Sequence, residues 1–563
     1  MGQEKYQTNQ SEPIVNNLQL VSNPLQFGNN ELFYQADGDK EEIITLRENR
    51  GRLSPLRHQQ LIALTVIDKI LTTHTPYHDD NYEYLFENNT GVINKVDPKN
   101  KDLRVLFCSI GINPSENEYK YTFEELLRTC RIQGKKVTIH KFTYFDDKNF
   151  VSYIDNKHKV YRVTKDSIEV VKNGDNNILF HTDEDFIPFE LVEIDKKADY
   201  IDKFILEKTT FDKEESSLTP EEQSLIIKFW MLCLFFESIM PTKPIVLFQG
   251  QKGSGKSMIS KFIGKTLFGN SFNVTPLPND EKDFVTIVTN CCYLVLDNVD
   301  TKVKWLNDKL ASCATGQKIF KRELYTTNDM SKFIAKCFIA ITSRTPQFLR
   351  DDIVDRLLPI YCKRIDEGKF IAESILTKDV IEHRNEIMTF IIRKSQDCLR
   401  LLELKQDETI HTSFRIADFA TFCIKCAEVF SNREEIESIF DKLSKNQLEL
   451  AVEEDGLLHA LKIMLSIHGW ENKEITPRHL FEWLSDIASA NNIKDFKYES
   501  PRAIGRRLSN IKENIKTLII FEKIKKRANK CNYRFSFASD EIRSQCQAEV
   551  MNTINCNSKL RKY

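Results

Sequence analysis

The sequence has no apolar run long enough to cross a lipid bilayer, for which a helix needs about 20 consecutive apolar residues. Its most apolar stretch, residues 225–240, is shorter than this and contains Lys228 and Glu237. We therefore expect a buried helix there and no membrane partner. The first residues are polar and lack the apolar core of a secretion signal, so we do not expect a secreted protein.

Paired cysteines of the kind that bind metals are also scarce. Of the 14 cysteines, only Cys423 and Cys426 form a C-x-x-C pair, and no second pair accompanies them. We expect these two residues on a buried helix, with a metal or redox site as the alternative. Cysteines scattered through apolar segments are typical of a reducing cytosol, which predicts a cytoplasmic protein.

An excess of positive charge is absent as well. The chain has 80 Lys and Arg residues against 82 Asp and Glu residues, for a net charge of −2. Any contact with nucleic acid must then come from local basic patches. The sequence shows no internal repeat and no coiled-coil heptads, and its 563 residues suffice for several domains.

Composition and periodicity change several times along the chain. The start is rich in Asn, Gln and Glu without apolar periodicity, which indicates disorder. Strand signals follow, with turns such as Asn173-Gly174, the signature of a type I′ hairpin. A charged stretch before the helix-start pair Thr219-Pro220 indicates a linker. The predicted segments are a disordered tail (1–45), an N-terminal α+β domain (46–200), a linker (201–222), a motor domain (223–365), a helical domain (366–452), a C-terminal module (453–540) and a polar tail (541–563).

Residues 250–257 fit the phosphate-binding pattern G-x-x-x-x-G-K-[ST], the P-loop. A β-type apolar run precedes this loop and a helical stretch follows it. Glycines lack a Cβ atom, so backbone N–H groups can bend onto phosphates, and the helix N-terminus adds partial positive charge. A glycine-rich turn that binds nothing is the alternative. The residues expected to hold the nucleotide, ATP, are Gly250, Gln251, Lys252, Gly253, Ser254, Gly255, Lys256 and Ser257.

Lys256, Ser257 and Asp297 have separate expected roles. Lys256 would reach the β and γ phosphates, and the Ser257 hydroxyl would hold Mg²⁺. Asp297 would supply the acid on the metal side, because it ends the continuous apolar strand 291–297, which is typical of a buried parallel strand. A turn-forming Asp after such a strand is the alternative.

The residue that activates the attacking water is harder to assign. Many P-loop motors have an acid directly after the metal-side Asp, but this chain has Asn298 there, and an amide cannot act as a base. Asp300 is the substitute that we consider.

The strand at 337–343 is expected between the two motif strands, with its polar end, Ser343, at the γ-phosphate or the attacking water. Arg356 precedes the next strand. An arginine at a subunit edge can reach the neighbour's γ-phosphate and stabilise developing charge. Arg344 and Arg350 are rivals for this role, and a plain surface ion pair is the alternative for Arg356.

Several stretches of the motor segment resemble superfamily 3 helicase ATPases, above all the poxvirus-type, phage and mobile-element primase-helicase proteins. The resemblance is strong over 223–365 and weaker over 81–195. The stretches that carry it are 277–280 (Leu-Pro-Asn-Asp), 297–299 (Asp-Asn-Val), 315–325 (Thr-Gly-Gln-Lys-Ile-Phe-Lys-Arg-Glu-Leu-Tyr), 341–346 (Ile-Thr-Ser-Arg-Thr-Pro) and 355–358 (Asp-Arg-Leu-Leu).

The resemblance implies an AAA+-like core, a homo-hexameric ring with ATP at the subunit interfaces, and a hairpin that follows nucleic acid in the central pore. Residues 317–336 correspond to this hairpin, and a solvated hairpin face is the alternative for each of its charges. The basic residues implied as phosphate contacts are Lys318, Lys321, Arg322 and Lys332. Two departures stand out: Ser343 replaces the Asn of many relatives, and no primase signature precedes the motor, so a primase or replication partner would be a separate protein.

The C-terminal module shows three helical stretches and then two strands, the element order of a winged helix. Basic residues gather on its third helix and its hairpin, and such a patch attracts phosphate. Docking to protein alone is the alternative, since winged helices also bind proteins. The expected DNA contacts here are Arg502, Arg506, Arg507, Lys525, Lys526 and Arg527.

The sequence therefore predicts an α/β P-loop NTPase core with a parallel sheet, preceded by an α+β domain and followed by a winged helix. The expected function is that of an ATP- and Mg²⁺-dependent helicase or translocase on single-stranded or forked DNA, in replication of a phage, plasmid or mobile element. A DNA-binding ATPase switch or loader without unwinding, in defence or regulation, is the alternative. The long N-terminal arm, the hairpin and the basic C-terminal module argue against a small-molecule kinase.

Overall fold

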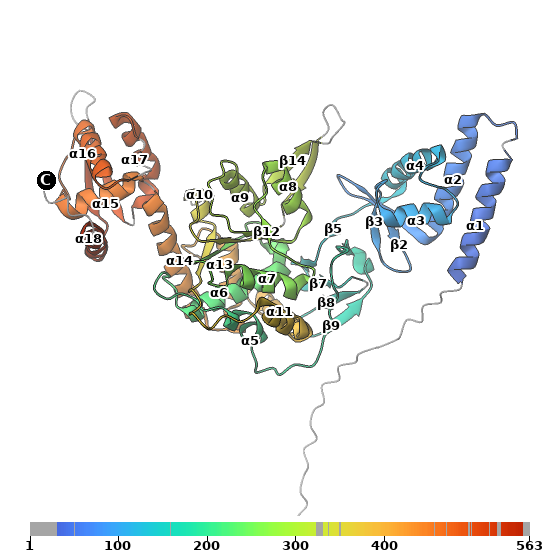
Figure 1. The fold of residues 1–563 in the computed structure, drawn as a ribbon, viewed down its shortest axis with the longest axis horizontal. Helices are drawn as coiled ribbons and strands as arrows, with labels where there is room; N and C mark the ends of the chain where they lie inside the picture. Colours follow the sequence, from blue (N-terminus) through green and yellow to red (C-terminus); the bar gives the residue numbers. More distant parts are fainter. Residues whose placement is uncertain are drawn as a thin grey trace, which may run out of the picture. The chain divides into compact units, whose positions relative to one another are not determined.

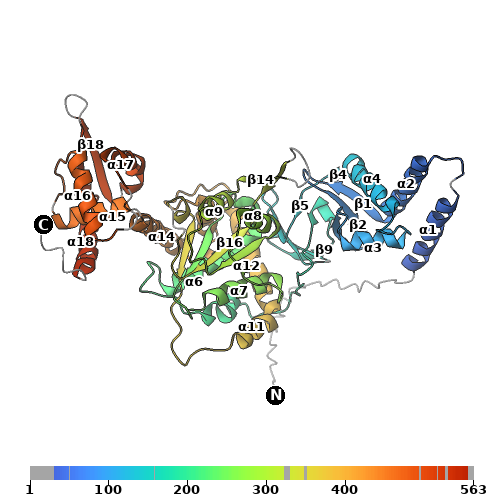
Figure 2. The ribbon, with the colours of Figure 1, turned by 45° about the horizontal axis from the view of Figure 1, so that its top comes forward.

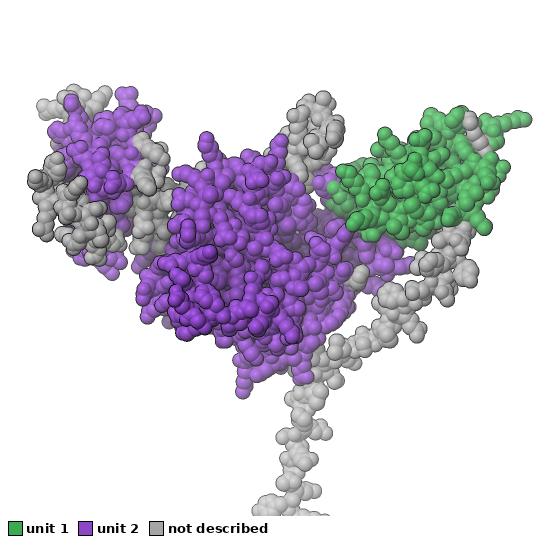
Figure 3. All heavy atoms as spheres, viewed as in Figure 1, with its two compact units in different colours: residues 1–77, 83–85, 94–135 green, residues 78–82, 86–93, 136–563 purple. Residues whose placement is uncertain are grey.

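The computed structural model describes residues 31–555, apart from 50, 158, 323–329, 336, 348–350, 455, 469, 494–495, 497, 517 and 526–530. The chain forms two compact units, shown in different colours in Figure 3. Residues 1–77, 83–85 and 94–135 make up the first unit, and residues 78–82, 86–93 and 136–563 make up the second.

The first unit combines helices with a small sheet (Figures 1 and 2). Its core consists of apolar side chains at helical and alternating spacing, such as Val66, Leu85, Phe107 and Phe123, each at most 2% exposed. The sheet has the strand order β3-β2-β1-β4. The elements of this part of the chain are α1 (Glu31–Glu48), α2 (Pro55–Thr73), β1 (His74–His78), β2 (Glu83–Glu87), β3 (Ile93–Lys95), α3 (Lys101–Ser109), α4 (Asn117–Gln133) and β4 (Lys135–Lys136).

The prediction of a disordered tail over 1–45 is wrong for its last part, because α1 begins at Glu31. Ile43 is fully buried and Leu46 packs against the same core. Residues three positions apart lie on the same face of a helix, so Ile43 and Leu46 together pack α1 against this core. Residues 1–30 lie outside the described residues.

The second unit begins with an antiparallel sheet that was expected to belong to the preceding α+β domain. Its strands β6 (Thr143–Asp146), β7 (Val151–Asp155), β8 (Val160–Val163) and β9 (Ile168–Val171) pair in sequence order. The ring of Phe145 lies 5.0 Å from that of Phe236, and Phe142 lies 5.3 Å from Phe235. The predicted boundary at residue 200 is therefore wrong, because this sheet shares its core with residues 234–239, which directly follow the helix of residues 220–233.

The predicted hairpin at Asn173-Gly174 is also wrong. Gly174 has the positive φ that a turn requires, at 93°, but the strand after it pairs elsewhere. The two-residue strand β10 (Leu179–Phe180) runs parallel to β5 (Ile139–His140) instead of pairing with β9. The buried Asn173 amide donates to the Gly91 and Phe180 carbonyls, which holds the chain in this turn.

The predicted linker at 201–222 is ordered and packed. It contains α5 (Tyr200–Phe204), whose Ile201 is fully buried. The ammonium of Lys228 on α6 (Pro220–Cys233) lies 3.0 Å from the Asp199 carboxylate and 2.8 Å from that of Asp202. The charged residues that indicated a linker thus pair with the helix they precede. Thr219 caps α6, as its sequence predicts.

A five-stranded parallel sheet forms the centre of the second unit, with the order β12-β13-β16-β11-β17. Alternate residues of its strands are buried on opposite faces: Val246 and Phe248 face one apolar core, and Ile245 and Leu247 face another. Its strands and neighbouring helices are β11 (Ile245–Gln249), α7 (Lys256–Phe268), β12 (Thr275–Pro276), α8 (Glu281–Asn290), β13 (Tyr293–Asp297), α9 (Leu306–Ala314), β16 (Phe338–Ser343), α10 (Asp351–Val354) and β17 (Leu357–Tyr361).

An antiparallel hairpin precedes β16, as the sequence predicts. Its strands are β14 (Lys318–Arg322) and β15 (Met330–Ile334), paired so that Phe320 lies opposite Lys332. The helices that follow the sheet are α11 (Glu373–Glu382), α12 (Arg384–Leu404), α13 (Ala417–Lys425) and α14 (Arg433–Glu454). Cys423 and Cys426 are fully buried, with Cys423 on α13 and Cys426 directly after it.

The C-terminal module has its own apolar core and the predicted order of three helices and a hairpin. The predicted polar tail at 541–563 is wrong in its first part, because Cys546 and Val550 on the last helix are buried in this core. The elements are α15 (Gly456–His468), α16 (Pro477–Ala490), α17 (Pro501–Ile515), β18 (Ile519–Lys525), β19 (Cys531–Phe537) and α18 (Asp540–Asn555). None of the helices within the described ranges has both the length and the apolar character needed to cross a membrane.

One carboxylate of the antiparallel sheet titrates in an unusual range. Asp155 ends β7 and is 2% exposed, and it accepts a hydrogen bond of 2.5 Å from the Thr182 hydroxyl. Burial raises the pKa of Asp155 to about 7, against the opposing effect of this hydrogen bond. Below about pH 7 the folded protein therefore keeps Asp155 neutral, whereas an unfolded chain ionises it above about pH 4.

Replacing Asp155 by Asn should stabilise the protein in a pH-dependent way. Because the pKa is raised in the folded state, the wild type loses stability as the pH rises from about 4 through 7, whereas Asn has no charge to lose. Asp155→Asn should therefore raise the Tm more at pH 8 than at pH 5. The full gain in the free energy of unfolding, reached above pH 7, is about 4 kcal/mol. Thermal unfolding at both pH values measures this, with the exposed Asp147→Asn as control. An equal difference at both pH values would contradict it.

Candidate nucleotide-binding site

The loop at 250–255 connects β11 to α7 and has a backbone shape that only glycine allows. A Cβ atom on Gly250 would lie 2.2 Å from the Cys362 carbonyl oxygen, far inside contact distance. Gly253 and Gly255 adopt φ angles of 80° and 82°, in the left-handed region that disfavours other residues. The remaining loop residues are Gln251, Lys252 and Ser254. The loop ends at the N-terminus of α7.

Lys256, the first residue of α7, folds its side chain back over this loop. Its Nζ donates to the Gly250 carbonyl at 2.6 Å and to the Gln251 carbonyl at 2.9 Å. The residue is only 7% exposed. Burial lowers the pKa of Lys256, while the nearby carboxylates Asp300 and Asp297 partly oppose this. A poorly hydrated cation held by neutral oxygens is suited to a strong interaction with a phosphate.

Asp297 ends β13 and receives hydrogen bonds from three side chains of the site. The Ser257 hydroxyl donates to its Oδ1 at 2.6 Å, and the Thr342 hydroxyl donates to the same oxygen at 2.5 Å. The Asn298 amide donates to Oδ2 at 3.0 Å. The predicted order is confirmed, since β16, which carries Thr342, pairs with both β11 and β13.

The hydroxyl of Ser257 and the carboxylate of Asp297 fit a magnesium ion. Both are hard oxygen ligands, and they meet beside the phosphate loop. Mg²⁺ is usually bound through one or two protein oxygens together with phosphates and waters. Among the described residues, no group of three or more His, Cys, Asp or Glu side chains could hold a metal by itself, so nucleotide phosphates would have to complete the coordination.

The structure separates the roles of Thr342 and Ser343. Ser343 is fully buried, with its hydroxyl 2.9 Å from the Val299 carbonyl and 2.7 Å from Asp300 Oδ1. Thr342, not Ser343, touches Asp297. Successive residues of a strand point to opposite faces, so only one of the two can do so. The sequence predicted a polar end of this strand, but it did not indicate which of the two residues faces Asp297.

Asp300 does not have the properties of a general base. Its Oδ1 accepts hydrogen bonds from the backbone N–H groups of Arg344 (2.7 Å) and Thr345 (3.1 Å) as well as from Ser343. Partial burial raises its pKa, but these hydrogen bonds outweigh it, so the pKa of Asp300 lies below its usual value. A carboxylate that is stabilised in its charged form accepts a proton poorly. Its contacts instead fasten the end of β16 to the loop after β13.

Arg356 lies at the end of the sheet that is far from the phosphate loop of the same chain. Its carbonyl accepts from Ile245 N–H at 2.9 Å, at the start of β11, whereas the loop follows the end of this strand. Five residues of a strand span roughly 16 Å, farther than an arginine side chain extends. Arg344, in contrast, is exposed and follows β16 on the loop side. Arg350 lies outside the described residues.

The expected nucleic-acid contacts are described only in part. The side chains of Lys318, Lys321, Arg322 and Lys332, like all of Lys526 and Arg527, lie outside the described part of the chain. On α17, Arg502 and Arg506 are exposed and Arg507 is half-buried, and Ile504 and Leu508 face the core. Lys525, at the end of β18, is exposed.

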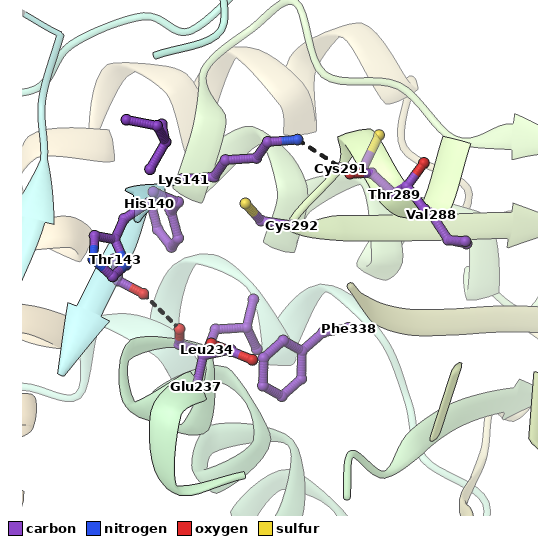
Figure 4. A pocket seen from close by; sticks show the side chains of 12 residues that line it. His140, Lys141, Thr143, Leu234, Glu237, Val288, Thr289, Cys291, Cys292 and Phe338 are labelled. Carbon is purple, nitrogen blue, oxygen red and sulfur yellow. Dashed lines mark hydrogen bonds between the residues drawn. The ribbon is translucent and has the colours of Figure 1, made fainter. Parts of the chain in front are cut away.

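A cavity of about 170 Å³ lies at the opposite end of the sheet from the loop (Figure 4). Of the residues that line it, Cys292 directly precedes β13 and Phe338 is the first residue of β16. Lys141 also lines it and donates to the Thr289 and Asn290 carbonyls at 3.2 and 3.0 Å. This ammonium caps the last carbonyls of α8, so it has a structural partner. The cavity is separate from the phosphate loop.

Comparison with known proteins gives one family and several distant structures. Residues 215–443, less than half of the chain, match the family model of the actinomycete integrative conjugative element replication protein. No curated protein matches the chain. The C-terminal region of NrS-1 is 11% identical and has a TM-score of 0.41, with 84% of this chain and 98% of that chain covered.

Two further structures align over smaller parts of the chain. The ORC1 protein of Aeropyrum pernix in complex with DNA is 12% identical over 59% of this chain and 93% of that chain, with a TM-score of 0.19. The JCV helicase is 14% identical over 41% of this chain and 64% of that chain, with a TM-score of 0.17. TM-scores this low say nothing about the function of this chain.

Removing the Thr342 hydroxyl should disturb the metal-side carboxylate without disturbing the loop. Thr342→Val keeps the shape of the side chain but leaves Asp297 without one of its donors. Groups that orient metal ligands typically contribute 10- to 100-fold in metal affinity or activity, so the Mg²⁺ concentration for half-maximal ATPase rate should rise at least tenfold. Thr342→Ser, which retains the hydroxyl, should behave like the wild type. Equal Mg²⁺ dependence of all three proteins would refute this role.

Proposed function

We propose that this protein is an ATP-dependent DNA helicase or translocase that acts in the replication of a mobile element, plasmid or phage. The observation that carries the proposal is the meeting of three elements at Asp297. The phosphate loop contributes Ser257, β13 contributes the carboxylate, and the strand between them contributes Thr342. A plain phosphate-binding turn needs none of these connections.

The residues of the site divide the work on ATP between them. The loop N–H groups and Lys256 would hold the phosphates, and Ser257 with Asp297 would hold Mg²⁺. The bound ion would neutralise charge on the β and γ phosphates during transfer to water. Thr342 keeps Asp297 oriented, and Asp300 keeps the end of β16 in place.

Arg356 supports a ring-shaped assembly of several copies, for which we propose a hexamer. It cannot reach the loop of its own subunit, so a role at ATP requires a neighbouring subunit. Its neighbour Asp355 is ion-paired with Arg415, which ties the start of β17 to the helical part. This position suits an arginine that stabilises the γ-phosphate of the next subunit during hydrolysis.

DNA is the proposed track because basic residues recur in two places. The hairpin β14–β15 has four of them, and the exposed face of α17 carries Arg502 and Arg506. Helix α17 and the hairpin β18–β19 would form a winged helix that contacts DNA phosphates. The description of the matching family, a replication protein of an integrative conjugative element, supports replication of such an element. A primase would be a separate partner.

A second candidate function is a DNA-binding ATPase switch or loader that does not unwind DNA. One observation favours it: neither Asn298 nor Asp300 suits the activation of water. Asn298 is an amide with a left-handed φ of 54°, committed to Asp297, and Asp300 is held in its charged form. A site without an efficient base binds ATP but hydrolyses it slowly.

Unwinding of a forked duplex separates the two functions. The helicase proposal expects ATP- and Mg²⁺-dependent strand displacement together with ATPase activity that single-stranded DNA stimulates. Lys256→Ala should abolish both by removing the cation from the phosphates. Lys148→Ala, which changes an exposed lysine of the turn between β6 and β7, is the control and should retain most activity. ATP turnover without displacement on any forked substrate would favour the switch. No ATP binding at all would refute both functions.

A further inference from the structure

A segment that follows β17 lies directly against the phosphate loop. The N–H of Ile365 donates to the Gly253 carbonyl at 3.1 Å, and a Cβ atom on Gly253 would lie 3.5 Å from the ring of Phe370. Phe370 is 56% exposed, and the next apolar residues, Ile371 and Ile375, are 60% and 62% exposed. Three large apolar side chains are thus exposed in and just after the segment that reaches the loop, and Phe370 is the one that lies against Gly253.

The other flank of the loop holds a buried hydroxyl. A Cβ atom on Gly255 would lie 3.3 Å from Thr209 Oγ1 and 3.5 Å from the terminal methyl of Met258. Thr209 is 7% exposed, and its hydroxyl has no hydrogen-bond partner among the described residues. A buried polar group without a partner is destabilising, so such a group often marks a place where a ligand binds.

The two flanks belong to one surface, because Gly253 and Gly255 are two residues apart in the same loop. The backbone also connects them: Lys363 N–H donates to the Thr210 carbonyl at 2.8 Å, and Phe211 forms an antiparallel bridge with Cys362. An aromatic ring, a flexible methionine and a hydroxyl therefore lie next to Gly253 and Gly255 of the phosphate loop. A nucleobase has apolar faces and a polar edge, which these groups match.

We propose that Phe370, Met258 and Thr209 form the subsite for the base of the bound nucleotide. The base packs against the Phe370 ring, and the Thr209 hydroxyl becomes its hydrogen-bond partner at the edge once Met258, whose side chain is flexible, turns aside. Ile371 and Ile375 extend the apolar wall. The proposal rests on the proposed function, since it takes the loop to hold a nucleoside triphosphate, and it adds the residues that select the base.

The comparison of ATP with inorganic tripolyphosphate tests the subsite, because the second ligand has the phosphates but no base. Stacking of a base on an aromatic side chain contributes about 1–3 kcal/mol, so Phe370→Ala should weaken ATP about tenfold or more in calorimetric titration with Mg²⁺. The affinity for tripolyphosphate should stay within twofold of the wild type. Phe370→Trp, which keeps an aromatic face, should restore ATP affinity, and Leu404→Ala, an exposed apolar residue of α12, is the control.

The outcomes separate the subsite from the loop itself. If Phe370→Ala weakens ATP and tripolyphosphate equally, the segment acts on the loop and the base proposal is wrong. If neither affinity changes, the apolar residues serve another surface, such as contact with a second copy, and the proposal is again wrong. If the wild type binds neither ligand, the proposed nucleotide function fails instead.

Thr209→Val tests the hydroxyl separately. This variant keeps the shape of the side chain and removes the unpartnered group, so the Tm of the nucleotide-free protein should rise. ATP should bind about tenfold more weakly to Thr209→Val, and tripolyphosphate should bind as it does to the wild type. Unchanged ATP affinity would remove Thr209 from the subsite.

Discussion

The carboxylate of Asp297 is the point on which the site depends. One of its oxygens accepts hydrogen bonds from both Ser257 and Thr342, so it links the start of α7 to the end of β16. This link is possible only because β16 is inserted between β11 and β13 in the sheet. Strand order therefore determines the chemistry here: with β11 and β13 adjacent, no third strand would place a hydroxyl at the metal-side acid.

The position of α7 depends in turn on a buried arginine. Arg384, the first residue of α12, donates to the carbonyls of Thr266 and Leu267 at the end of α7, at 2.8 and 3.2 Å, and to that of Pro188 at 3.0 Å. Burial lowers its pKa to about 10, and the Phe189 ring lies 5.6 Å from the guanidinium. A cation at a helix C-terminus is favourable, so this residue joins α7 to the helical part and to the segment after the antiparallel sheet.

The sequence predicted what is repetitive or chemically specific in this protein. Glycines at 250, 253 and 255, the apolar strand before Asp297 and the strand before Ser343 are local patterns, and the structure brings them together at the ends of three neighbouring strands. Interfaces between segments were not predictable in the same way. The charges at 199–202 were consistent with an exposed segment, but Asp199 and Asp202 form ion pairs with Lys228, which lies on the helix that follows. Apolar residues of the antiparallel sheet bury against α6 and its extension, which no local pattern reveals.

The site shows the same limit at finer scale. Alternation along β16 guarantees that Thr342 and Ser343 face opposite sides, yet nothing in the sequence decides which side holds Asp297. Likewise, Asp300 is a plausible base by position alone, and only its three donors identify it as a fastening group. Thr209 precedes all strands of the parallel sheet in the sequence, and Phe370 follows all of them. That both residues lie beside the loop therefore depends on the three-dimensional fold.

The most direct measurement of the central claim is the effect of Mg²⁺ on ATP affinity. Calorimetric titration of the full chain with ATP, in Mg²⁺ and in EDTA, should show at least tenfold tighter binding with the ion. In Asp297→Asn, which keeps the shape of the side chain but loses its charge, this enhancement should disappear while binding in EDTA is retained. An unchanged Mg²⁺ enhancement in Asp297→Asn would contradict the account, because the carboxylate would then not be the group on the metal side.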